Sequence, residues 1–133
     1  MNLSIPKILD FPSNGNQGTG YLSFVEDTET IPFEIKRVYW IYDIPEEVLR
    51  GNHAHKHDEQ VIICIAGSAE IEVIGQSQNQ AFFKLVHPSK GLYIPKLYWK
   101  NIRLSKGACL VCLSSTLYDP KAYIKDFNEF INV

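Results

Sequence analysis

The stretch that decides the fold is Ala66-Gly67-Ser68-Ala69-Glu70-Ile71-Glu72-Val73-Ile74. From Ala69 onward apolar and acidic residues alternate, so the side chains at 69, 71 and 73 share one face. The two glutamates between them point the other way, which is typical of a β-strand with one buried face. The small residues at 66–68 that precede this strand predict a tight hairpin turn.

Similar short runs continue along the chain in both directions. They cover Tyr21–Val25, Lys36–Ile44, Gln60–Ile65, Ala69–Ile74, Ala81–Val86, Gly91–Ile94, Asn101–Leu104 and Cys109–Leu113. Residues 13–20 are rich in turn formers and predict a loop. Only the C-terminal end has helical spacing, with Asp119 as a cap and Pro120 in the first turn, followed by apolar residues at 123, 124, 127 and 131. We therefore expect an all-β antiparallel sandwich or barrel with a short C-terminal helix, in one domain over residues 1–133.

Composition excludes several classes of function. The net charge is −2 and no basic run marks a nucleic-acid surface. No stretch approaches the roughly 20 apolar residues of a membrane span, and the first residues lack an apolar core of signal-peptide length. The three cysteines fit a reducing compartment, so we expect a cytoplasmic protein. Cys109 and Cys112 lie three apart on an apolar strand and are interpreted as core thiols.

Three of the four histidines lie in the segment Arg50-Gly51-Asn52-His53-Ala54-His55-Lys56-His57. In an extended chain His53 and His55 point into the same space, whereas His57 is interpreted as a surface residue. His-x-His followed by a glutamate, here Glu59, is the first metal-binding motif of the cupins. The segment 91–100 has the frame of the second cupin motif, but Lys100 replaces its final histidine. A protonated lysine cannot ligate a metal, although the two histidines and Glu59 could still form a three-ligand site.

Several motifs occur together in one order along nearly the whole chain. They are Lys36–Ile41, Arg50–Lys56, Glu59–Val61, Gly91–Ile94, the segment around Trp99, Tyr118–Asp119 and Tyr123–Ile124. This pattern resembles the dTDP-4-keto-6-deoxyglucose 3,4-ketoisomerases, the WxcM-like cupin family. The resemblance implies a cupin jelly roll, a dTDP-linked keto-deoxysugar as ligand, and neither a metal nor another cofactor. It also implies a homodimer, commonly with exchanged N-terminal strands, that serves deoxysugar and surface polysaccharide biosynthesis.

The resemblance assigns roles to individual residues. The first histidine of the motif is the proton shuttle in this family, a role that falls on His53, with Tyr39 and His55 as its active-site partners. Two positions near the sugar depart from the pattern. Lys100 stands where relatives usually have His or Arg, and Thr19 stands where they often have Arg or Tyr. These departures leave open which C4 epimer is formed.

The chemistry expected is proton transfer between C3 and C4 of the sugar through an enediol. A neutral imidazole suits the removal of the C3 proton, so His53 is the expected base, with Tyr39 serving the two oxygens. Lys100, if it points inward, could stabilise the developing negative charge. Arg50 is expected to bind or position the ligand phosphates, and Trp99 to stack on the base or sugar.

Two other classes of function stay open on the sequence alone. One is a metal-dependent cupin dioxygenase or isomerase that uses His53, His55 and Glu59. The other is a non-catalytic sugar-nucleotide-binding protein, which the unusual Lys100 and Thr19 leave open. Metal analysis separates the first from the ketoisomerase, and binding without turnover would indicate the second.

Overall fold

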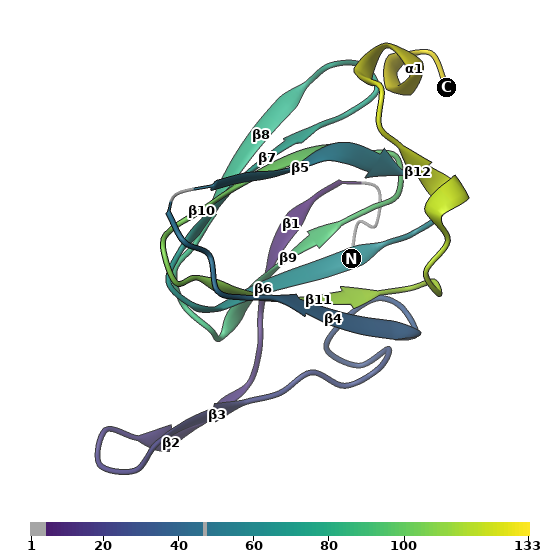
Figure 1. Cartoon of the computed structure of the whole chain (residues 1–133). Helices are drawn as coiled ribbons and strands as arrows, with labels where there is room; N and C mark the ends of the chain where they lie inside the picture. Colours follow the sequence, from purple (N-terminus) through teal and green to yellow (C-terminus); the bar gives the residue numbers. More distant parts are fainter. Residues whose placement is uncertain (1–4, 47) are drawn as a thin grey trace.

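The computed structural model describes residues 5–46 and 48–133, and two five-stranded antiparallel sheets face each other in it (Figure 1). The first sheet has the order β1-β9-β6-β11-β4, with strands at Lys7–Asp10, Lys90–Ile94, Gln60–Ala66, Cys109–Ser114 and Arg37–Ile41. The second has the order β12-β5-β10-β7-β8, with strands at Tyr123–Ile124, Val48–His55, Trp99–Leu104, Ala69–Ile74 and Gln80–Leu85. This arrangement confirms the predicted all-β jelly roll.

The alternating stretch behaves as its sequence predicts. Ala69, Ile71 and Val73 of β7 are almost wholly buried, whereas Glu70 is exposed. The hairpin predicted at 66–68 is wrong, because β6 pairs with β9 and β11 while β7 pairs with β8 and β10. Gly67 instead carries the chain from one sheet to the other at φ +73°, where an added Cβ would lie 2.9 Å from the Ala108 Cα.

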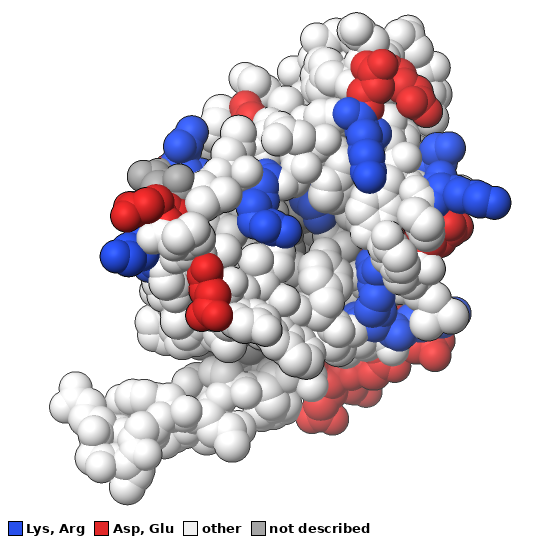
Figure 2. Space-filling model, in the orientation of Figure 1, with Lys and Arg blue, Asp and Glu red and all other residues white. Residues whose placement is uncertain are grey.

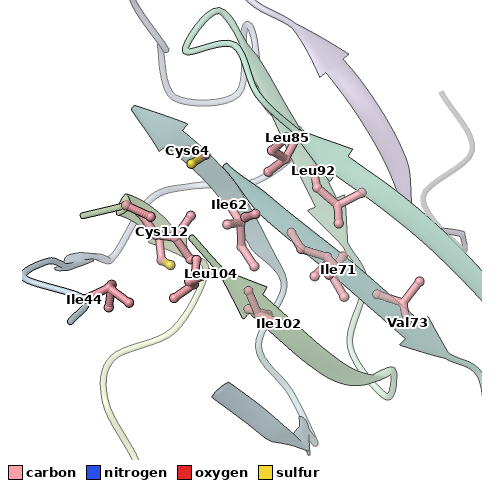
Figure 3. Packing of buried hydrophobic residues seen from close by; sticks show 14 residues of the cluster. Ile44, Ile62, Cys64, Ile71, Val73, Leu85, Leu92, Ile102, Leu104 and Cys112 are labelled. Carbon is pink, nitrogen blue, oxygen red and sulfur yellow. The ribbon is translucent and has the colours of Figure 1, made fainter. Parts of the chain in front are cut away.

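The main core fills the space between the two sheets (Figure 3). Ile62 and Leu92 come from the first sheet, and Ile71 and Ile102 come from the second. A second cluster covers the outer face of the first sheet, where the 25–35 segment packs on it. Strands β6 and β11 of the first sheet therefore bury both faces along part of their length, which explains the apolar runs at 60–65 and 109–113.

The C-terminal segment differs from the single helix that the spacing predicts. Asp119 accepts a hydrogen bond from the Lys121 N–H, but it caps only a 3-10 turn, η1, at Pro120–Ala122. The next residues form β12, and α1 covers only Phe127–Ile131. Phe130 of α1 is fully buried in a third cluster, with Trp99 and Ile124. The helix thus closes one end of the second sheet and contains fewer residues than the spacing predicts.

An exposed hairpin replaces the loop predicted at 13–20. β2 at Ser13–Asn16 pairs with β3 at Gly20–Ser23 in a separate two-stranded sheet, and every residue of both strands is exposed. This arm extends away from the barrel (Figure 1). Large apolar side chains, Tyr21 and Leu22, face solvent on it. No helix in residues 5–46 and 48–133 is long and apolar enough to cross a membrane.

Candidate active site

A pocket of about 320 Å³ opens between the two sheets at one end of the barrel. Inward-facing residues of five strands and two tyrosines of the C-terminal segment line it: Arg37, Tyr39, Ile41, Arg50, Gly51, His53, Ile62, Lys100, Ile102, Cys112, Tyr118 and Tyr123. Three of these residues are cations, and none is a carboxylate. Figure 2 shows a hollow on this face with basic side chains around and inside it. The charge suits an anionic ligand.

A β-bulge in β5 sets which side chains enter the pocket. His53 lies opposite Lys100 and Gly51 lies opposite Asn101, so Asn52 is an extra residue in β5. The bulge shifts the alternation by one, and Arg50 therefore faces the pocket together with His53 in spite of their odd spacing. Gly51 adopts φ +93°, and a Cβ there would lie 2.6 Å from the Lys100 carbonyl oxygen. Only glycine fits this position without strain.

The two motif histidines contact each other directly. His53 Nδ1 lies 3.0 Å from the Gly51 carbonyl oxygen, and its Nε2 lies 3.2 Å from Nε2 of His55. A carbonyl only accepts, so Nδ1 of His53 carries the proton and its Nε2 carries the lone pair. His55 then donates its Nε2–H to that lone pair. The hydrogen bonds therefore leave His53 in the tautomer that a general base at Nε2 requires.

Both imidazoles are neutral at physiological pH. Burial, followed by the charge of Lys100, lowers the pKa of His53 to about 4 and that of His55 to about 2. His55 Nδ1 lies 3.9 Å from an Asp58 carboxylate oxygen, but a neutral imidazole makes no ion pair with it. Tyr123, which pairs with His55 across β12 and β5, packs its ring against both imidazoles at centroid distances of 4.5 and 5.0 Å. These contacts hold the pair in place.

Tyr39 supplies a protonated phenol. Burial and the neighbouring Cys112 raise its pKa well above the usual range. Its hydroxyl oxygen accepts a hydrogen bond of 3.0 Å from the Gln60 amide nitrogen and also hydrogen-bonds with the Cys112 thiol. The Arg37 guanidinium lies 5.1 Å from the Tyr39 ring centroid. At neutral pH the phenol is therefore a hydrogen-bond donor and not an anion.

Lys100 points into the barrel, as the mechanism requires. It is 3% exposed, and its ammonium donates to the Gln60 Oε1. Burial lowers its pKa to about 8, while Cys112 and Asp58 act in the opposite direction. The group therefore remains mostly protonated at pH 7 and places a positive charge inside the pocket.

A buried carboxylate anchors the floor below these groups. Asp58, 3% exposed, accepts from the backbone N–H groups of Ser115 and Thr116 at 2.9 and 3.2 Å and from the Gln60 amide at 3.0 Å. Arg37 lies 3.5 Å from its second oxygen. Asp58 thus has hydrogen-bond partners for both oxygens and offsets part of the positive charge nearby.

The structure does not bring every predicted residue into this pocket. Trp99 is the strand neighbour of Lys100 and so faces the opposite side of β10, where it packs against Phe127 and Phe130. Thr19 lies in the turn of the β2–β3 arm, outside the pocket of its own chain. His55 contacts His53 but does not line the cavity.

The third residue of the alternative metal set also faces away. The Glu59 carboxylate accepts a hydrogen bond of 2.5 Å from the Tyr93 hydroxyl, on the other face of β6 from Gln60. Over residues 5–46 and 48–133, no cluster of three or more His, Cys, Asp or Glu side chains is arranged to hold a metal ion. The ligand set His53, His55 and Glu59 is therefore not assembled.

The sequence interpretation assigned no role to several residues that line the pocket or lie directly behind its wall. Arg37 and Gln60 belong to quoted motifs, and strand alternation from Tyr39 and Ile62 would have placed them on the same inner face. Tyr123 was assigned to the predicted C-terminal helix, so its place in the pocket was not expected. A groove of about 350 Å³ on the outer face of the second sheet, lined in part by Leu49, Phe82 and Glu70, lacks histidine and tyrosine, so the chemistry belongs to the inner pocket.

Two facing antiparallel sheets around a polar pocket define a cupin-type jelly roll. The family model described as FdtA, WxcM-like, C-terminal matches residues 4–133, and the chain belongs to this family. It is 36% identical over 112 residues to a TDP-4-oxo-6-deoxy-α-D-glucose-3,4-oxoisomerase of Aneurinibacillus thermoaerophilus, covering 84% of this chain and 80% of that one.

Solved structures agree with this assignment. A 3,4-ketoisomerase from Helicobacter canadensis superposes with a TM-score of 0.89 at 41% identity, over 96% of this chain and 95% of that one. A sugar 3,4-ketoisomerase from Thermoanaerobacterium thermosaccharolyticum, solved in complex with TDP, gives a TM-score of 0.88 at 33% identity, over 98% and 95% of the two chains. The family resemblance drawn from the sequence is confirmed.

Proposed function

We propose that this protein is a metal-independent 3,4-ketoisomerase that converts a dTDP-linked 4-keto-6-deoxyhexose to its 3-keto isomer. The observation that carries the proposal is the His53 tautomer, whose unprotonated Nε2 lies in a cation-lined pocket beside a protonated Tyr39. Relatives at 36% and 41% identity are named as 3,4-isomerases of this kind.

The reaction begins with removal of the proton at C3, which the neighbouring C4 carbonyl makes acidic. His53 Nε2 takes this proton once the substrate displaces the N–H of His55 from it. His55, whose pKa is lowered further than that of His53, does not compete for the proton. His53 then returns the proton to C4 of the enediol, which completes the isomerisation.

The oxygens need a donor and a positive charge while the enediol exists. Tyr39, as a neutral phenol, donates to one sugar oxygen and can pass its proton between O3 and O4. The buried Lys100 ammonium stabilises the negative charge that develops there. Lys100 thus places a positive charge at the sequence position where metal-dependent cupins have a metal-binding histidine.

Phosphate binding is assigned to the two arginines at the pocket. Arg50 is exposed at its rim, and the guanidinium of Arg37 lies near the ring of Tyr118, 5.4 Å from its centroid. Guanidinium groups suit a diphosphate because they bind its oxygens in pairs. The complex of a 33% identical relative with TDP supports dTDP as the nucleotide.

A homodimer would complete the site. β4 is an edge strand of the first sheet and exposes Val38 and Trp40, and Tyr42 directly after it is exposed as well. The β2–β3 arm exposes further apolar side chains. Exposed apolar surface of this extent marks an interface. In the proposed dimer the arm of one subunit lies on its partner and brings Thr19 to the partner's pocket. The three cysteines are free, which fits a cytoplasmic step in deoxysugar and polysaccharide biosynthesis.

Turnover by matched histidine variants tests the proposal. Wild-type protein should convert dTDP-4-keto-6-deoxyglucose to a 3-keto sugar, and His53→Asn should lower kcat about 10³-fold while dTDP still binds, as measured by calorimetry. His57→Asn is the control, because His57 is exposed and lies outside the pocket. Wild-type protein that binds dTDP without turnover would instead indicate a non-catalytic sugar-nucleotide-binding protein.

A further inference from the structure

Gln60 lies behind the residues that line the pocket and touches two of the groups assigned to the reaction. It is the first residue of β6 and is 1% exposed. Its Oε1 accepts from the Lys100 ammonium, and its Nε2 donates to the Tyr39 hydroxyl oxygen at 3.0 Å. It therefore joins a cation from the second sheet to a phenol from the first sheet through one amide.

The neighbours of the amide fix its orientation from both ends. An ammonium only donates, so the atom that faces Lys100 must be the carbonyl oxygen. On the other side, Nε2 faces the Asp58 carboxylate at 3.0 Å, and a carboxylate only accepts. Ser114 Oγ lies farther from Nε2, at 3.2 Å, so the two amide hydrogens go to Asp58 and Tyr39. If the amide were flipped, its nitrogen would face the Lys100 ammonium, donor against donor, and its oxygen would face the Asp58 carboxylate, acceptor against acceptor.

This orientation determines where the Tyr39 proton can go. Because the amide occupies a lone pair of the phenol oxygen, the Tyr39 O–H is free to donate elsewhere, toward Cys112 or toward a sugar oxygen in the pocket. The carbonyl end supplies an acceptor for a buried ammonium that would otherwise be stabilised only by more distant charges. Both effects depend on one side chain.

We propose that Gln60 is a positioning residue that holds the Lys100 ammonium and orients the Tyr39 phenol as a single unit for proton transfer. The inference rests on the proposed ketoisomerase function and adds to it a residue that does not line the cavity. When negative charge develops on a sugar oxygen, the amide keeps the ammonium and the phenol in fixed positions, so neither has to reorganise during the reaction.

Gln60→Leu removes both contacts at similar volume. It should lower kcat roughly 10- to 100-fold with less than about a threefold change in KM, because positioning acts on the transition state. A buried ammonium without its acceptor loses its proton more easily, so the alkaline limb of the kcat/KM profile should move below about pH 8. A residue with a merely structural role would not move this limb.

Ser114→Ala is the matched control. It removes the hydroxyl that lies 3.2 Å from the Gln60 amide nitrogen but leaves the contacts to Lys100 and Tyr39 intact, so kcat should stay within about threefold of wild type. A double-mutant cycle between Gln60→Leu and Tyr39→Phe should show strong non-additivity, because the amide acts partly through the phenol.

Gln60→Leu leaves a buried ammonium without an acceptor and can fail to fold. In that case Lys100→Met is compared with Lys100→Met/Gln60→Leu, in which no unpartnered ammonium remains. The second substitution should still lower kcat about 10-fold through Tyr39. Wild-type levels of kcat in Gln60→Leu, or no further loss in the double variant, would overturn the inference while leaving the proposed function intact. A wild-type protein without turnover would instead contradict the function itself, and the inference with it.

Discussion

Gly51→Ala tests whether the bulge in β5 positions the catalytic histidine. The substitution puts a Cβ 2.6 Å from the Lys100 carbonyl oxygen on a backbone at φ +93°. An L-residue with positive φ costs about 1–2 kcal/mol, and relieving the overlap costs about 1–3 kcal/mol more. The free energy of unfolding should therefore fall by about 3 kcal/mol, which corresponds to a loss of roughly 10 °C in Tm.

The same displacement should reach the site. Lys100 and His53 are opposite each other at the bulge, so moving the two strands apart shifts the base and the ammonium together. A shift of a few tenths of an ångström should lower kcat about 10- to 100-fold. Circular dichroism melts and steady-state turnover of the dTDP-keto sugar measure the two effects.

Gly107→Ala is the control for backbone strain. Gly107 has φ +74°, and nothing lies within 4 Å of an added Cβ. This variant should lose only about 1–2 kcal/mol and keep the wild-type kcat. If Gly51→Ala melts no lower than Gly107→Ala and turns over like wild type, the reasoning about the bulge is refuted.

Four further predictions address the pH dependence of activity, the pH dependence of stability, the assembly and the C-terminal helix. The kcat/KM profile should fall on the acid side near the His53 pKa of about 4, where the base becomes protonated, and on the alkaline side near the Lys100 pKa of about 8, where the ammonium is lost. His53 and His55 are neutral in the folded protein, so their contribution to the free energy of unfolding is complete above their unfolded pKa of about 6.5. This contribution is lost as the pH falls toward 4, at up to about 1.4 kcal/mol per pH unit for each histidine. Urea titrations at pH 7, 6 and 5 that give equal stabilities would contradict this prediction. Trp40→Glu should convert the proposed dimer to monomer in sedimentation velocity, and an unchanged dimer would place the interface elsewhere. Phe130→Ala should cost about 3–5 kcal/mol, since Phe130 is fully buried; a loss below about 1 kcal/mol would mean that α1 does not pack on β10 in solution.

Local patterns predicted the parts of the fold that depend on one strand at a time. Alternation at 69–74 predicted β7 correctly because the spacing of apolar residues within a strand determines which of its faces is buried. The turn at Gly67 was misassigned because small residues suit both a hairpin and a crossing between sheets, and only strand pairing distinguishes them. Tyr123 and Ile124 fit a helix by spacing, but their pairing with β5 makes them a strand.

The candidate site was likewise predictable only where a single strand or motif determines the position of a residue. His53 and His55 share a face by simple alternation, and the family motif identifies Tyr39. Arg50 needs the bulge to enter the pocket, and a bulge is not visible in strand periodicity. The contact between Gln60 and Lys100 joins residues 40 positions apart on different sheets, so only the fold shows it.

Proton NMR of the reaction in D2O with EDTA present tests the central claim most directly. The account predicts that wild-type protein converts dTDP-4-keto-6-deoxyglucose to a 3-keto sugar at an undiminished rate after metal removal, with solvent deuterium at C3 or C4, since the base exchanges its proton with water. The coupling constants of the product also give its C4 configuration. Unchanged substrate, or turnover that EDTA abolishes and a divalent metal restores, would contradict a metal-free ketoisomerase.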